Sequence, residues 1–235
     1  MTRRYDLALK GLAPASPSAA RGTRRMVTRG KRARIGSTTL RGPYLPPETW
    51  YEPAEDRTGD CFTLVCRSPG QGYRHVVTED DVRQRLARLP AGMLNDLHVV
   101  ELSTMTRKKR RAPCYGMQWG STIYLYPIEE SLSETFDAPP KPAQKVEAAM
   151  YGARWQHAGG RWQLVWSEEA IRDFYLNNVL IHELGHILDN RNSRYLDRER
   201  FAEWFAVEHG YRASRRAELA QRAAAKYIVR RHHRS

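Results

Sequence analysis

The segment that most constrains the fold is SEEAIRDFYLNNVLIHELGHILDN, residues 167–190. Ser167 followed by Glu168 and Glu169 is typical of a helix start, because serine caps the first turn and acidic residues favour its dipole. Apolar residues then recur with a helical period. The sequence therefore predicts one long helix over residues 168–190, against which the rest of the domain must pack.

This helix carries two histidines, His182 and His186, four residues apart. Both imidazoles leave the same face one turn apart, so two ring nitrogens can share one tetrahedral metal ion. Glu183 could reach a metal-bound water without being a ligand, which is the HExxH pattern of zinc hydrolases. Gly185 leaves room for the metal or for a neighbouring element. The alternative is a buried core helix whose histidines bond to backbone or carboxylate partners.

A second helix is predicted in YLDRERFAEWFAVEHG, residues 195–210, with Asp197 at its start. Glu199 and Glu203 repeat the four-residue step of the histidines. Three interleaved aromatic residues give a stripe that would pack this helix on the first: Phe201, Trp204 and Phe205. Because burying an unpaired carboxylate is costly, two acidic residues on a packed face indicate a cation opposite them. A dication held between the two helices meets this requirement.

HELGH followed by ERFAEWFA resembles the gluzincin metallopeptidases. The second-helix pattern is similar to that of the anthrax lethal-factor catalytic domain and its relatives, and to the looser motif of the ImmA/IrrE-like regulatory peptidases. The resemblance implies that Glu199 is the third zinc ligand and that Glu203, one turn later, supports a ligand histidine. It also implies an α+β, minimal zincin-like fold. In that fold a small mixed or antiparallel sheet packs on the HExxH helix and on a second, ligand-bearing helix, and STIYLYP could be the edge strand over the cleft.

The chain departs from these relatives between the two motifs. Twelve residues separate His186 from Glu199, fewer than is usual. The tyrosine that stabilises the transition state has no match at the usual offset. Tyr195 is the nearest candidate, and Tyr211 is a weaker one.

Two other zincin arrangements would place the third metal ligand at a different residue of this segment. The metzincin pattern is excluded, because its glycine and third histidine would fall on Asp189 and Asn192. A third-histidine arrangement, similar to that of SprT-type DNA–protein-crosslink proteases, would have to use His209. That arrangement stays open as an alternative to Glu199.

The motifs predict a zinc-dependent metalloendopeptidase acting on a protein or peptide substrate. His182, His186 and Glu199 would hold Zn²⁺, which lowers the pKa of a bound water toward roughly 7. Glu183 would act as the general base and then donate the proton to the leaving amine. Tyr195 would help to stabilise the oxyanion.

The formal charge of +13 is concentrated at the two ends of the chain. Residues 1–42 hold eleven Lys or Arg against one acidic residue and residues 212–235 hold eight against one, whereas residues 43–211 carry a net charge of −4. This distribution predicts a basic, disordered arm, a zincin-like metallopeptidase domain, and a basic C-terminal helix or tail, in that order. Only the two ends suit a nucleic-acid partner.

The alternative function is therefore a nucleic-acid-associated binding protein in which zinc only joins two helices. The basic ends and the RKKRR run at residues 107–111 favour it. A structural zinc site is closed by a fourth protein ligand, whereas a catalytic site keeps one position open. No fourth ligand of convincing spacing is apparent, which favours catalysis.

No apolar stretch approaches the roughly 20 residues of a membrane-spanning helix, so no membrane partner is expected. No secretory leader is recognisable, and Cys61, Cys66 and Cys114 cannot all pair with one another. Both observations favour a cytoplasmic protein with free thiols. A transit peptide in residues 1–42 stays an alternative, because that stretch is rich in Arg and poor in acidic residues.

The rest of the domain alternates strand-like runs with turn signals, and it should supply the sheet. Strands are predicted in residues 61–66, 73–78, 97–103 and 121–128, with the last at or near an edge because of Pro127. A capped helix is predicted over residues 78–89, a polybasic loop at 107–111, a break at 138–144 and a hairpin over 151–166.

Overall fold

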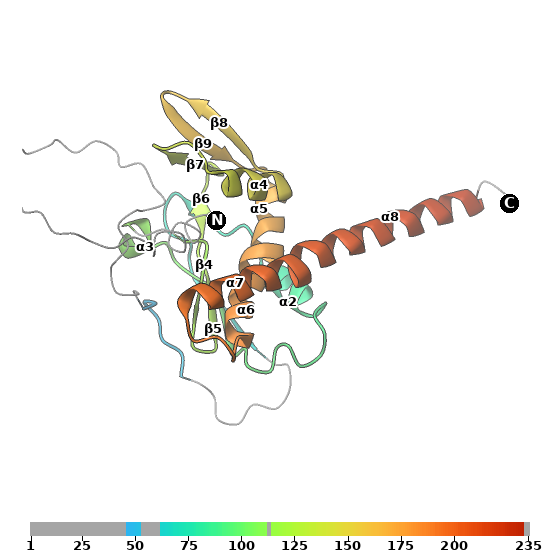
Figure 1. Ribbon diagram of the computed structural model, residues 1–235, viewed down its shortest axis with the longest axis horizontal. Helices are drawn as coiled ribbons and strands as arrows, with labels where there is room; N and C mark the ends of the chain where they lie inside the picture. Colours follow the sequence, from blue (N-terminus) through green and yellow to red (C-terminus); the bar gives the residue numbers. More distant parts are fainter. Residues whose placement is uncertain (1–45, 53–61, 112–113, 233–235) are drawn as a thin grey trace, which may run out of the picture.

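The structure, a computed structural model, describes residues 46–52, 62–111 and 114–232 (Figure 1). It is an α+β fold of small sheets and several helices, as expected. Figure 1 shows the long helix with the two histidines running beside the strands, and the C-terminal helix extending away from the rest of the molecule. The predictions made for residues 1–42 and for Cys61 lie outside the described residues.

The main sheet has four strands in the order β1-β3-β5-β4. Its strands are β1 (Thr63–Cys66), β3 (Val99–Leu102), β4 (Gly116–Trp119) and β5 (Thr122–Leu125). The first three in spatial order are parallel, and β4 is antiparallel to β5. Every residue of β3 and β5 is buried, as expected for central strands covered on both faces.

Residues 121–128 lie near a sheet edge, as Pro127 suggests, but STIYLYP is not the edge strand itself. β5, which lies within that range, pairs with β3 on one side and β4 on the other, and β1 and β4 are the two terminal strands. Pro127 lies two residues after Leu125, the last residue of β5, so it removes no hydrogen bond from the ladder. The edge strand on this side of the sheet is therefore β4, with the sequence GMQW.

Two smaller sheets lie beside the main one. They contain β2 (Tyr73–Arg74) with β6 (Ile128–Glu129), and β7 (Ser133–Phe136), β8 (Arg154–Ala158) and β9 (Arg161–Val165) in the order β7-β9-β8. The predicted hairpin is confirmed as β8 and β9, and both turn glycines, Gly159 and Gly160, have positive φ. Of the predicted strand at 73–78, only two residues pair.

The helices account for most of the remaining described chain. They are α2 (Glu79–Leu86), α3 (Arg107–Arg111), α4 (Pro142–Met150), α5 (Glu168–Phe174), the π-helix η1 (Tyr175–Val179), α6 (Leu180–Leu188), α7 (Tyr195–Phe205), the π-helix η2 (Ala206–Arg212) and α8 (Ala213–His232). The predicted starts of two helices are confirmed, because Thr78 accepts from the amide of Asp81 and Ser167 from that of Ala170. The predicted long helix is α5, η1 and α6 in succession.

Two segments predicted as irregular are helical. The basic run 107–111 is α3, and Lys109 within it is buried with its amine 4.1 Å from the centre of the Tyr126 ring. The run is therefore not an entirely solvated patch. The break predicted at 138–144 ends at Lys141, since Pro142 begins α4, a position that proline favours.

Arg85 joins α2 to both π-helices from inside the protein. Its guanidinium donates to the Asn177 side chain at 2.6 Å and to the His209 carbonyl at 2.5 Å. Burial lowers the pKa of Arg85 to about 10. The π-helices also touch directly, because a Cβ on Gly210 would lie only 1.9 Å from the Asn177 carbonyl oxygen. These contacts fix η2, which continues α7, against η1, which leads into α6.

The basic C-terminal region is helical in its described part, as α8. Its side chains are partly or fully exposed through residue 225. Within the described ranges, no helix has the length and apolar character needed to cross a membrane. Cys66 and Cys114 are free thiols.

Candidate metal centre

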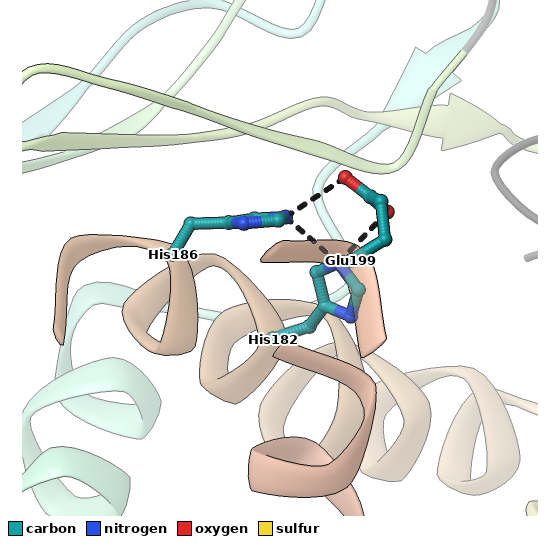
Figure 2. A group of neighbouring side chains, drawn as sticks. All are labelled: His182, His186 and Glu199. Atoms are coloured by element: carbon teal, nitrogen blue, oxygen red, sulfur yellow. Dashed lines mark hydrogen bonds and ion pairs between the residues drawn. The ribbon is translucent and has the colours of Figure 1, made fainter. Parts of the chain in front are cut away.

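Three buried side chains from two helices converge on one point. His182 and His186 leave the same face of α6 and Glu199 comes from α7, and Figure 2 shows the three pointing toward one another. The two Nε2 atoms are 3.1 Å apart. Nε2 of His186 lies 3.2 Å from Glu199 Oε1, and Nε2 of His182 lies 3.7 Å from Oε2.

These separations fit a tetrahedral ion. Two ligand atoms at roughly 2.0–2.1 Å from zinc, with a tetrahedral angle between them, are about 3.3 Å apart. The 3.1 Å between the two Nε2 atoms and the 3.2 Å between His186 Nε2 and Glu199 Oε1 lie close to that value, and the 3.7 Å from His182 runs to the other carboxylate oxygen, Oε2. Two imidazole nitrogens and one carboxylate oxygen are also a donor set typical of catalytic zinc. The residues present therefore fit a zinc ion.

The loop between α6 and α7 explains how a short gap returns Glu199 to the histidines. Asp189 ends α6, and its carboxylate accepts from the backbone amides of Arg191 and Asn192. Arg198 of α7 then donates to the carbonyl of His186 at 3.0 Å, in the last turn of α6. The chain reverses tightly, so twelve intervening residues suffice.

Gly185 lets α7 approach α6 closely. A Cβ at this position would lie 3.0 Å from the Cα of Ala202 and 3.2 Å from the Cβ of Phe205. Ala202 and Phe205 are buried on the same face of α7 as Glu199. Gly185 thus accommodates a neighbouring helix, as the sequence indicated, and that contact holds Glu199 in place beside the two histidines.

Two details predicted for α7 are wrong. Trp204 is 52% exposed, because it lies about 160° around the helix from Ala202, which contacts Gly185, and so faces away from α6. The helix begins at Tyr195 after Arg194, so Asp197 lies in the first turn and is not the capping residue. The packed stripe is made by Ala202 and Phe205, with Phe201 only partly buried.

The side chain of Glu183, a residue of α6, lies against the edge strand β4. It is only 2% exposed, and a Cβ on Gly116, the first residue of β4, would lie 2.9 Å from its Oε1. The same Cβ would lie 2.6 Å from Cγ1 of Val179. The lack of a side chain at Gly116 therefore lets the strand approach the acid that follows His182.

No family model matches the chain, and no curated protein or solved structure matches it. The interpretation of this site accordingly rests on its own residues and geometry.

The other residues singled out in the sequence have different surroundings. Glu203 lines a cavity together with His182. Tyr195 is 47% exposed at the start of α7, and its role in catalysis stays a prediction. Tyr211 packs against Tyr151, with Arg215 over its ring. His209 stacks on Phe205, and it is not among the three side chains that converge.

Sequence reasoning missed Gly116, Glu147 and Asn178. Asn178 donates to Glu147 at 2.9 Å, and both line the cavity beside His182. A signal for this region was present, since Asn177 and Asn178 stand in the middle of a helix that asparagine does not favour. The structure has a π-helix there, an irregularity often found at functional sites. Nothing in the sequence pointed to Glu147 or Gly116.

The Gly116→Ala variant is expected to be less stable by about 1–3 kcal/mol, because the added methyl group overpacks the contact with Val179 and Glu183. It should also lower any hydrolytic activity by displacing Glu183. Urea-induced unfolding measures the first effect and a peptide assay the second. Adding Val179→Ala removes Cγ1 of Val179, the atom nearest to the new methyl group. The double variant should therefore be more stable than the sum of the two single effects predicts. An alanine variant as stable and active as the parent would contradict this packing.

Proposed function

We propose that the chain is a zinc-dependent metallopeptidase of the gluzincin type. The observation that carries the proposal is the convergence of His182, His186 and Glu199 at separations that fit tetrahedral zinc. When bound, zinc would supply a Lewis acid that polarises the scissile carbonyl and the attacking water. Of the described residues, three side chains and no fourth converge there, which suits a site with one open position.

The protein's own residues have separate roles in this mechanism. His182, His186 and Glu199 hold the ion. Glu183 accepts a proton from water while the oxygen of that water bonds to the peptide carbonyl carbon. Glu183 then delivers the proton to the amine nitrogen as the C–N bond breaks. Its burial beside Gly116 keeps the carboxylate in a fixed position during both transfers.

The arrangement of the sheet supports a zincin-like architecture. Three parallel strands are followed at one edge by the antiparallel strand β4, and α6 packs against β4 and β5. An extended peptide lying along β4 would therefore pass the face of α6 that carries the metal ligands. Tyr195 is kept in the proposal as a residue that stabilises the oxyanion once substrate is bound.

The alternative is a nucleic-acid-associated protein with structural zinc. The projecting basic helix α8 favours a polyanion partner, whereas the burial of Lys109 in α3 weakens the contribution of the RKKRR run. Three converging ligands also favour catalysis over a closed structural site.

The test combines metal analysis with hydrolysis of a peptide panel by the full chain. We expect one zinc per chain, hydrolysis that stops on treatment with a chelator, and recovery when zinc is restored. Hydrolysis that persists after complete removal of metal would overturn the proposal. Bound zinc without hydrolysis of any peptide would instead favour the structural-zinc alternative.

A further inference from the structure

A cavity of about 260 Å³ adjoins the metal ligand His182. Its walls come from the segment before β4, from α4, from α5 with η1, and from α7 with η2. The residues lining it are Cys114, Tyr115, Ala143, Val146, Glu147, Met150, Phe174, Asn178, Val179, His182, Glu203, Ala206 and Val207. Pockets for drug-sized ligands usually measure about 300–1,000 Å³, so this volume suits one side chain of a bound peptide.

The cavity opens to solvent on the α4 side. Val146 belongs to its wall and is 61% exposed, whereas the Phe174 and Val179 walls are buried. His182 also belongs to the wall. A substrate with its scissile bond at the metal ligands could therefore place a neighbouring side chain in this space.

The cavity wall is apolar but carries two carboxylates, Glu147 and Glu203. None of the described residues that line it is Lys or Arg. Glu147 is only 7% exposed, and its Oε1 accepts a hydrogen bond from Asn178 at 2.9 Å. This bond holds the carboxyl group at a defined place in surroundings where charge interactions are only weakly screened.

The apolar wall and the two carboxyl groups of the cavity favour some substrate side chains over others. A purely apolar side chain would bring carbon atoms against the carboxylates and could form no hydrogen bond to them, which is costly. An acidic side chain would be repelled. A Lys or Arg side chain can pack its methylene stem on Met150, Val179 and Val207 and bring its cationic end to Glu147.

We propose that this cavity receives a Lys or Arg side chain of the peptide substrate, next to the bond that is hydrolysed. The inference rests on the proposed peptidase function and names its substrate class: peptides with a basic residue adjoining the scissile bond. Glu147 is then a specificity-determining residue, supplied by α4 and held by Asn178 of η1.

The experiment compares peptide pairs in which Lys at each position near the scissile bond is replaced by norleucine. Norleucine keeps the four-carbon stem and lacks the ammonium group, so the pair isolates the charge. At one position, kcat/KM should be higher for the Lys peptide by about tenfold or more. The Glu147→Gln variant keeps an oxygen that can accept from Asn178, and it should reduce this ratio several-fold. The same substitution at the exposed Glu130 is the control and should leave the ratio unchanged.

Two further measurements test the inference even if the Glu147→Gln variant does not fold. Binding of the same peptide pairs to the Glu183→Gln protein, followed by fluorescence anisotropy, should show the Lys preference without turnover. Val207→Lys, which places a cation in the cavity, should lower the preference in the assay even if Glu147→Gln does not fold. A wild-type ratio near one at every position, or a ratio that survives both substitutions, would overturn the inference.

Failure of this inference can be told from failure of the proposed function. Metal-dependent hydrolysis without a preference for Lys or Arg removes the specificity assignment and leaves the peptidase. A protein that binds no metal and hydrolyses no peptide removes both.

Discussion

Replacement of Glu183 by Gln is expected to reduce peptide hydrolysis by about 10²–10⁴-fold while the protein still binds zinc. The amide has nearly the shape of the carboxylate, so the contact with Gly116 should be kept. It cannot accept the proton of the attacking water, however, and that step carries the loss. Because Glu183 is not among the converging ligands, the metal should remain.

Three measurements check this result: the rate on the best peptide, the zinc content, and the free energy of unfolding. Glu169→Gln, an exposed glutamate on α5 in the same continuous helix, is the matched control and should keep the parental rate. A Glu183→Gln protein that keeps full activity would remove Glu183 from the mechanism. A protein that loses zinc but keeps activity would overturn the whole metal assignment.

The convergence of His182, His186 and Glu199 was predictable because their geometry is largely local. A step of four residues on one helix puts His182 and His186 on one face whatever the rest of the chain does. Glu199 follows soon afterwards on a second helix, and the turn held by Asp189 returns it to the first. Few alternative arrangements fit such a short connection.

The order of the strands was less predictable because it depends on pairing between distant segments. The apolar run of β5 is the pattern of a central strand, and every residue of it is buried. Pro127 suggested an edge, but it lies beyond the paired residues. The edge strand next to β5 is β4, which begins with a glycine. The close approach that this glycine allows is apparent only in the fold, where α6 packs against it.

Buried charges were also missed for a physical reason. Lys109 stands in a basic run and Arg85 in a helix of mixed charge, and such side chains are ordinarily solvated. In the fold, Lys109 lies over the Tyr126 ring, and Arg85 donates to Asn177 and His209. Glu147 is a similar case, since its partner Asn178 comes from a different helix. Only tertiary structure brings such partners together.

The second large effect is expected from Glu199→Gln, which should weaken zinc binding by more than 100-fold and abolish hydrolysis. In the proposed site this carboxylate would supply the third ligand, and it is the only acidic group among the three converging side chains. Loss of a group that only supports a ligand typically costs about 10–100-fold in metal affinity, so loss of a ligand should exceed that range.

Glu203→Gln is the matched control, because it makes the same change one helical turn later on α7. If Glu203 supports His182, its substitution should weaken zinc binding by about 10–100-fold and leave measurable hydrolysis. Zinc affinity can be measured by competition with a chromogenic chelator, and the metal-to-chain ratio by elemental analysis.

Thermal unfolding gives a readout of the ligand assignment that does not depend on turnover. A ligand that binds only the folded state stabilises it by about 2.7 kcal/mol when its free concentration is 100 times its Kd. Zinc should therefore raise the Tm of the wild type clearly and that of Glu203→Gln at a higher concentration, with little effect on Glu199→Gln. The reverse order of the two variants would make Glu203 the third ligand, and equal small effects would mean that neither carboxylate binds the metal.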